Sequence, residues 1–208
     1  MSYSKPPLLA ANPMDAQKIQ QAYLRALYTG VVDQPTNEEE SFLHAHLSPE
    51  RLLIEHAARV RNLRAVLHDD MHVLSKTLNK ADLLPYVHRY VLSEQFWMHR
   101  GRTLIEDFCL HFVEQSPAPT LHKVLARIEG IHSGLSAAPR SRTPWPAHAK
   151  WNEGDDICEG FASPLNLSFH RLFDKPSDYQ PVSQEVNCIL RRSGKSIHVK
   201  FHNAQSCK

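Results

Sequence analysis

The chain has 208 residues, of which 42% are hydrophobic, and this suits one domain or two small ones. Its formal net charge is +2 with neutral histidines, so no strong overall field predicts nucleic acid or a membrane surface as the partner. The four cysteines include no Cys-x-x-Cys pair, so a zinc ribbon is not expected. No signal peptide and no run of about 18 to 20 apolar residues stands out, and we expect a soluble cytoplasmic protein with reduced thiols.

Capping signals predict two helices in the first fifty residues. Asp15 is a good N-cap for the first helix, apolar residues recur at helical spacing behind it, and Gly30 suits its C-cap. Thr36-x-x-Glu39 has the pattern of a capping box and opens a short helix that extends to Leu47.

The longest amphipathic stretch begins at Ser48 and Pro49, where a capping residue precedes a proline at the first helical position. We expect Asp69-Asp70 to break this helix or to cap the next one. The apolar stripe is assigned to Leu53, Ala57, Val60, Leu63, Val66 and Leu67.

Two helices are expected to follow this stretch. The first covers residues 71–78, with Asn79 as a left-handed C-cap, and the second covers about 82–93. Pro85 fits only in the first turn of the second helix, because deeper placement would remove a backbone hydrogen bond.

Two more helices complete the helical part. Thr103-x-x-Glu106 is a capping box, and Thr120 caps the last helix, whose apolar residues extend to Leu135.

The composition then changes, and strand patterns replace helical ones. Residues 138–164 are rich in proline and predict an irregular linker or covering segment. Strands are expected at 165–173, 186–192 and 196–202, where apolar and polar residues alternate at least in part. Arg192-Ser193-Gly194-Lys195 predicts a hairpin turn between the last two strands.

These elements together predict the α+β class. A bundle of six to seven helices over residues 15–137 is followed by the irregular segment 138–164 and by a small antiparallel β-sheet over 165–203.

The histidines invite a metal-site interpretation, which the spacing does not favour. His68 and His72 stand at i and i+4, but Asp69 stands where the zincin helix needs a glutamate, and the Asp-Asp pair suggests a helix break. We therefore assign no metal ligand and expect no cofactor in this chain.

No catalytic constellation is apparent either. The sequence has no Gly-x-Ser-x-Gly, no glycine-rich phosphate loop and no His-Glu-x-x-His, and Cys158 follows two aspartates that would raise its thiol pKa. We assign no catalytic residue, although a His-rich metal-binding protein or hydrolase is kept as an alternative.

Two surfaces are candidates for recognition of a macromolecule. Arg59, Arg61 and Arg64 could form a basic helix face of a sequence-tolerant DNA-binding module, or simply a solvated face. Trp145 and Trp151 could anchor a partner or cover the core.

The C-terminal sheet is a third candidate, because the edge of a small sheet offers unpaired N–H and C=O groups to an added peptide strand. Its basic residues suit an acidic peptide, although they could equally protect the edge. The expected peptide contacts are Asn166, Leu167, Ser168, Phe169, His170, Ile189, Leu190, Arg191, Arg192, Ile197, His198, Val199 and Lys200.

Several segments resemble a family of helical domains once labelled putative DNA-binding domains, whose genes lie beside those of multi-iron enzymes that modify peptides. The most specific piece is Leu125-Ala126-Arg127-Ile128-Glu129, and Leu190 to Lys195 is similar to the family's late strand-turn-strand segment. The Tyr90 helix, and Asn79 where the family often has glycine, also match, and the resemblance covers about residues 15–202.

Within that family, the short length and the compact sheet look most like the MbnC group of methanobactin biosynthesis. This resemblance implies a non-catalytic accessory subunit that forms a heterodimer with an MbnB-like TIM-barrel oxidase carrying a multi-iron site. The pair would use oxygen to convert cysteines of a ribosomal precursor peptide into the oxazolone and thioamide groups of a copper chelator. The accessory subunit would hold the leader region of that precursor, with iron only in the partner.

Overall fold

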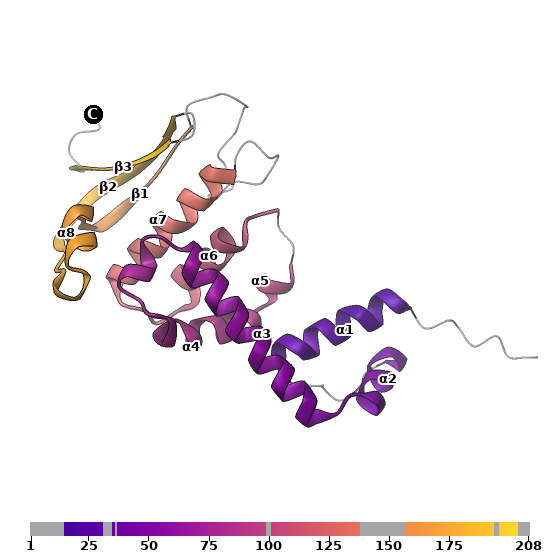
Figure 1. Cartoon of the computed structure of the whole chain (residues 1–208). Helices are drawn as coiled ribbons and strands as arrows, with labels where there is room; N and C mark the ends of the chain where they lie inside the picture. Colours follow the sequence, from indigo (N-terminus) through magenta and orange to yellow (C-terminus); the bar gives the residue numbers. More distant parts are fainter. Residues whose placement is uncertain are drawn as a thin grey trace, which may run out of the picture. The chain divides into compact units, whose positions relative to one another are not determined.

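The computed structural model describes residues 15–30, 35, 37–98, 101–137, 157–193 and 196–203 (Figure 1). The chain divides into two compact units, Met1–Arg59 and Val60–Lys208. Helices precede a three-stranded antiparallel sheet, so the predicted α+β class is confirmed. No helix in the described ranges combines the length and the apolar character needed to cross a membrane.

The first unit contains α1 (Ala16–Thr29), α2 (Glu38–His46) and the start of α3 (Pro49–Asp70). Asp15 caps α1 as predicted, because its carboxylate accepts hydrogen bonds from the N–H groups of Gln17 and Lys18. Helix α2 is capped by Asn37, one residue after the predicted Thr36, which lies outside the described residues. The small core of this unit includes Ala26, Leu27, Leu43 and Leu52.

Helix α3 ends at Asp70, as the Asp-Asp pair predicted, but only Val60, Leu63 and Leu67 of the six residues assigned to its apolar stripe are buried. Leu53 is 57% exposed and Val66 is 48% exposed. The sequence Leu52-Leu53-Ile54 is apolar in three directions around the helix, so periodicity alone could not choose the buried phase. The buried positions of α3 are Leu52, Val60, Leu63 and Leu67.

The predicted helix over 71–78 is wrong, because only a 3-10 turn, η1 (Leu74–Lys76), forms there. Asn79 is the N-cap of α4 (Lys80–Val91) and not a C-cap, and its side chain accepts hydrogen bonds from the N–H groups of Ala81 and Asp82. The helix therefore starts two residues earlier than predicted, and Pro85 lies inside it and not in its first turn.

The remaining helices before the sheet are α5 (Glu94–Trp97), α6 (Leu104–Gln115) and α7 (Thr120–Ala137). The capping box at the start of α6 is confirmed, with both of its reciprocal hydrogen bonds present. Thr120 is the first residue of α7. The core of the second unit is built mainly from large side chains of α4, α6 and α7, such as Tyr90, Phe108, Phe112, Leu125, Ile128 and Leu135.

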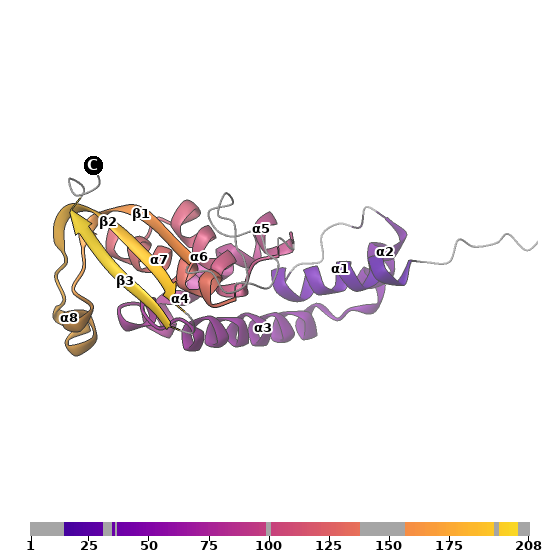
Figure 2. The same ribbon diagram turned by 90° about the horizontal axis from the view of Figure 1, so that it is seen from above.

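The sheet consists of β1 (Ile157–Asn166), β2 (Val182–Ser193) and β3 (Ser196–Asn203), in the order β1-β2-β3. The predicted hairpin is confirmed, because β2 and β3 pair antiparallel with Ser193 opposite Ser196. Figure 2 shows β2 between the two outer strands, and Figure 1 shows α7 along one face of the sheet.

The predicted strand over 165–173 is wrong. Strand β1 begins earlier, inside the segment predicted to be irregular, and ends at Asn166, whereas Phe169–Asp174 form helix α8. A short 3-10 turn, η2 (Pro176–Asp178), follows α8. The signal for this helix was the pair of aromatic rings at i and i+4, since Phe169 stacks on Phe173 at 6.1 Å.

Pro164 made β1 hard to predict, because proline is unfavourable inside a sheet. The register of β1 shifts between Ser163 and Leu165, and Pro164 lies at this irregularity, where proline is tolerated. Residues 138–156 of the predicted irregular segment, which include Trp145 and Trp151, lie outside the described residues.

Candidate functional site

The two faces of the sheet have different surroundings. Residues opposite one another in an antiparallel sheet share a face. Leu190 lies opposite Glu159 and Val199, Cys188 lies opposite Phe161 and Phe201, and the members of these sets on β1 and β2 are buried. This is the inner face, which packs against α7.

The inner face holds four of the residues that the sequence assigned to peptide contact, and two of them, Leu190 and Arg192, lie on β2. Leu190 is fully buried, so it is not available to a ligand. The Arg192 guanidinium donates a hydrogen bond from Nη1 to the backbone oxygen of Leu135 at 3.0 Å, near the C-terminal end of α7. The Leu190 side chain is therefore closed to a peptide, and one nitrogen of Arg192 is already bound to the end of α7, because both side chains face this helix.

Of the predicted contacts over 166–170, only Asn166 belongs to a strand. Asn166 is the last residue of β1, Leu167 is buried, and Phe169 and His170 belong to α8. The Ser168 N–H donates to the Tyr179 hydroxyl at 2.7 Å. This segment turns the chain from the sheet into α8 and offers no strand edge to a peptide.

Strand β2 is central, so the edges of the described sheet are β1 and β3. Strand β1 is an unsuitable docking edge, because its ladder is irregular at Pro164 and it directs the ionisable residue Glu159 inward. Strand β3 pairs with β2 in continuous register over its whole length, and in the described part of the chain no strand pairs with its other side. The regular open edge is therefore that of β3.

The hairpin geometry indicates which groups of β3 point to this edge. Two residues join Ser193 to Ser196, and the closing pair of such a short hairpin is hydrogen-bonded. Hydrogen-bonded and non-hydrogen-bonded pairs alternate along an antiparallel ladder. His198 and Lys200 therefore direct their N–H groups to β2, whereas Ile197 and Val199 direct theirs to the open edge.

The outer face of the sheet contains an open hollow of about 600 Å³. Its centre is a row across all three strands, in which Cys158 lies opposite Arg191 and Arg191 lies opposite His198. Among the described residues that line it, none is acidic and four are arginine, lysine or histidine. The lining consists of Cys158, Ile189, Arg191, Ser193, His198, Lys200 and His202.

Four of the residues predicted to contact a peptide therefore lie together in this hollow, namely Ile189, Arg191, His198 and Lys200. Ile197 and Val199 also lie on β3, but their side chains belong to the inner face, where both are half-buried. The prediction missed Cys158, Ser193 and His202, which belong to the same lining. Ser193 and His202 alternate with inner-face residues along their strands, and this pattern could have identified them. Cys158 could be assigned to the outer face only once the start of β1 was known, and the sequence did not indicate that start.

The histidine pair of the long amphipathic stretch is not brought onto one helix face. Helix α3 ends before His72, and the Nδ1 atom of His68 lies 3.5 Å from its neighbour Asp69. The His72 ring instead meets that of His132, with their centroids 6.3 Å apart, and burial lowers the pKa of His132. Within the described ranges, no three His, Cys, Asp or Glu side chains are grouped so as to hold a metal ion.

The three arginines of the alternative DNA-binding surface all lie on α3, but they do not share one face. A helix turns by about 100° per residue. Arg59 and Arg61 therefore point about 160° apart, and Arg64 lies nearer to Arg61, so the three do not form a single basic stripe.

Buried carboxylates connect α6 and α7 with the segments around them, and the sequence did not reveal them. Glu129 of α7 accepts hydrogen bonds from three successive N–H groups, those of His72, Val73 and Leu74, at 2.9, 2.6 and 3.2 Å. Because Glu129 is buried, it fixes the chain that follows α3.

Glu159 of β1 lies in a different environment. Burial and the nearby Glu106 carboxylate raise its pKa to about 8, against the opposing effect of Arg127. Its Oε1 atom is buried without a hydrogen-bond partner. We expect this side chain to be neutral at physiological pH, which explains how it is accommodated on the inner face of the sheet.

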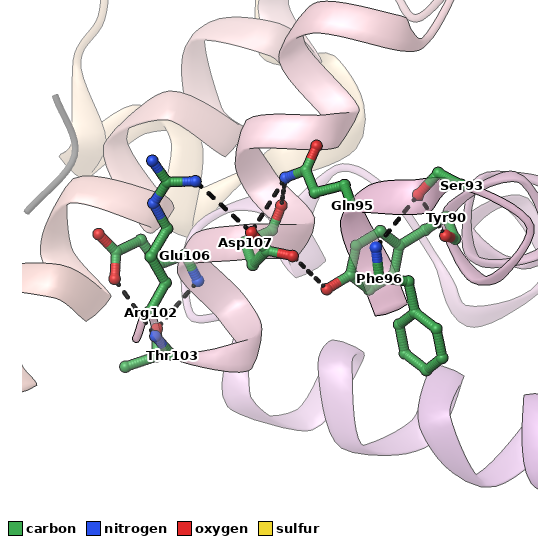
Figure 3. A network of polar contacts seen from close by, with 8 residues as sticks. All are labelled: Tyr90, Ser93, Gln95, Phe96, Arg102, Thr103, Glu106 and Asp107. Atoms are coloured by element: carbon green, nitrogen blue, oxygen red, sulfur yellow. Dashed lines mark hydrogen bonds and ion pairs between the residues drawn. The ribbon is translucent and has the colours of Figure 1, made fainter. Parts of the chain in front are cut away.

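Asp107 is a third buried carboxylate and the centre of a polar network (Figure 3). Its carboxylate accepts hydrogen bonds from the Tyr90 hydroxyl at 2.8 Å and from the Gln95 amide at 3.1 Å, and it lies 3.6 Å from the Arg102 guanidinium. These partners come from α4, from α5 and from the residue before the Thr103 cap. The network joins three helical segments, so we interpret it as structural and not as a catalytic site.

Comparison of the sequence with models of protein families found no match, and comparison with curated proteins found no significant relative. The hollow on the outer face and the open edge of β3 are therefore interpreted from their chemistry.

Proposed function

We propose that this chain is the non-catalytic partner of an iron-dependent oxidase that modifies a ribosomal precursor peptide in the cytoplasm. In this proposal the chain binds the leader region of the precursor by adding it as a strand to the β3 edge. The MbnB-like partner supplies iron and oxygen chemistry and converts core cysteines to oxazolone and thioamide groups. The product is methanobactin or a related copper-binding peptide.

The observation that carries this proposal is the regular edge of β3, with which no strand pairs in the described ranges. Main-chain hydrogen bonds to such an edge give affinity for a peptide of almost any sequence, and side-chain contacts on the two faces give selectivity. On the inner face, Ile197, Val199 and Phe201 are apolar but only half-buried, so an added strand would cover them further. The second supporting feature is the resemblance of the Leu125–Glu129 and Leu190–Lys195 segments to the accessory subunits of such oxidases.

Holding the leader on this chain would raise the effective concentration of the core cysteines at the iron site of the partner. A tethered segment encounters its site at about millimolar effective concentration when the linker is short and flexible. The accessory subunit can therefore accelerate the reaction without contributing a reacting group.

Co-expression with the products of the neighbouring genes tests the assembly. We expect the oxidase and the precursor to co-purify with this chain. If neither of them does so, the proposed partnership is wrong.

The edge itself is tested with Val199→Pro, which removes an N–H group that points to the open side of β3. We expect at least a tenfold loss of affinity for the precursor, measured by fluorescence polarisation, because proline also hinders the approach of the added strand. Val182→Pro is the matched control, since Val182 is exposed and is the first residue of β2, where proline is tolerated. Circular dichroism establishes that both variants are folded, and an unchanged affinity in folded Val199→Pro would exclude the β3 edge.

A further inference from the structure

The two faces of β3 make different demands on any strand that pairs with it. Its outer residues, His198, Lys200 and His202, are exposed and line the hollow. Its inner residues, Ile197, Val199 and Phe201, are apolar and half-buried. The strand is thus basic on one side and apolar on the other.

An added strand places each of its side chains beside a β3 side chain of the same face. Directly opposed Cβ atoms in an antiparallel pair are about 4.5 to 5.5 Å apart, which is within reach of a direct contact. Outer-facing residues of the ligand would therefore stand beside His198 and Lys200, and inner-facing residues would stand beside Ile197 and Val199.

From this arrangement we infer that the preferred ligand is a strand that alternates apolar residues with acidic ones. The acidic residues face the outer hollow, and the apolar residues complete the inner face. This inference rests on the proposed function and deepens it, because it names the chemical class of peptide that the β3 edge selects. A lysine-rich strand or an all-polar strand would form the same main-chain hydrogen bonds. The lysine-rich strand would be repelled by the basic outer face, and the all-polar strand would leave the apolar inner face without an apolar partner.

The charge distribution around the hollow supports an anionic partner. The part of its lining that the structure describes contains basic side chains on β2 and β3 and no acidic side chain. The volume of about 600 Å³ is large enough for several side chains of a bound strand. On the same face, Glu185 lies further along β2, towards the end where Val186 pairs with Asn203. We therefore place the acidic ligand positions at the opposite end, beside His198 and Lys200.

Synthetic peptides test the selectivity directly. The probes are three labelled ten-residue peptides in which valine alternates with glutamate, with glutamine or with lysine. We expect the glutamate peptide to bind at least tenfold more tightly than the lysine peptide at low salt, with the glutamine peptide in between. The affinity of the glutamate peptide should fall as salt is raised, because the charged contacts are exposed and screened.

The charge-reversal variant Lys200→Glu identifies the position. Exposed ion pairs contribute little individually, so we expect the glutamate peptide to bind about three- to tenfold more weakly to this variant, and the lysine peptide to bind more tightly. Lys175→Glu is the control, because Lys175 is exposed and follows α8, outside the lining of the hollow. It should leave both affinities unchanged.

The outcomes separate this inference from the proposed function. If all three peptides bind equally and Val199→Pro weakens all of them, the edge is correct and the acidic preference is wrong. If Lys200→Glu binds the glutamate peptide as tightly as the unmodified protein does, the preference is likewise overturned. If Val199→Pro leaves every affinity unchanged, the docking edge itself is wrong.

Discussion

The Glu129 carboxylate gives the sharpest test of how the second unit is held together. It is 2% exposed and accepts hydrogen bonds from three successive backbone N–H groups, those of His72, Val73 and Leu74. The substitution Glu129→Gln keeps the shape of the side chain but replaces one acceptor oxygen by an NH₂ group. That group can accept nothing and faces at least one of the three donors.

The cost follows from the hydrogen bonds that are lost. Hydrogen bonds to charged groups contribute about 1.5 to 3 kcal/mol each, and a buried donor left without an acceptor adds a desolvation penalty. The substitution removes one such bond and weakens the others, so we expect a loss of about 3 to 5 kcal/mol in the free energy of unfolding of the second unit. Proteins of this size are usually stable by only about 5 to 15 kcal/mol, so the variant should unfold at a visibly lower temperature.

Urea denaturation and hydrogen exchange together measure this effect. The amides of His72, Val73 and Leu74 should lose protection in Glu129→Gln, because their shared acceptor is changed. Glu114→Gln, an exposed position on α6, provides the same chemical change without buried partners and should alter stability by less than about 0.5 kcal/mol. A loss below about 1 kcal/mol in Glu129→Gln would refute the structural role of this carboxylate.

Three further predictions concern the interior. Tyr90→Phe removes the hydroxyl that donates to Asp107 and should cost about 1 to 3 kcal/mol in thermal or urea unfolding. Glu159→Gln should gain stability relative to the unmodified protein as the pH rises from about 4.5 to 8. Over that range the unfolded chain loses the proton of Glu159 while the folded protein, with its raised pKa, keeps it, so the unmodified protein is progressively destabilised. Melts at pH 5 and 8.5 would show no divergence between the two proteins if the carboxyl were not buried. Gly160→Ala would place a Cβ atom 2.9 Å from the backbone oxygen of Cys188, so we expect a loss of about 1 to 3 kcal/mol in urea unfolding, and a neutral result would show that β1 can move away from β2.

Much of the helical part was predictable because its ends carry local signals. Asp15 and the Thr103-Glu106 capping box are local chemistry, and the structure confirms both. Asn79 was assigned to the wrong end of a helix, because asparagine is favourable both at N-caps and in left-handed C-caps. The hydrogen bond of its amide to Asp82, three residues ahead, shows the signal that indicated an N-cap.

The sheet was predictable only where a hairpin-turn sequence and the alternation of apolar and polar residues indicated the same strands. The pattern around Ser193 to His202 fixed the β2–β3 hairpin, but the same alternation placed a strand over Phe169, where a helix forms. Which face of a strand is buried depends on the element that packs against it, and the sequence does not reveal which element that is. Arg192 illustrates this, since it looks like a surface cation in the sequence but donates to the end of α7.

The most specific part of the family resemblance accounts for the scaffold and not for recognition. In Leu125-Ala126-Arg127-Ile128-Glu129, all three apolar side chains are fully or almost fully buried. Arg127 lies over the Phe161 ring at 4.9 Å, and Glu129 holds the chain after α3. These residues anchor α7 to its surroundings, including the sheet, and so determine how the sheet is presented. The outer residues of β3 are constrained by none of these contacts. A relative could therefore share the scaffold and bind a different peptide, and for this reason the tests of function above change Val199 and Lys200 and leave α7 intact.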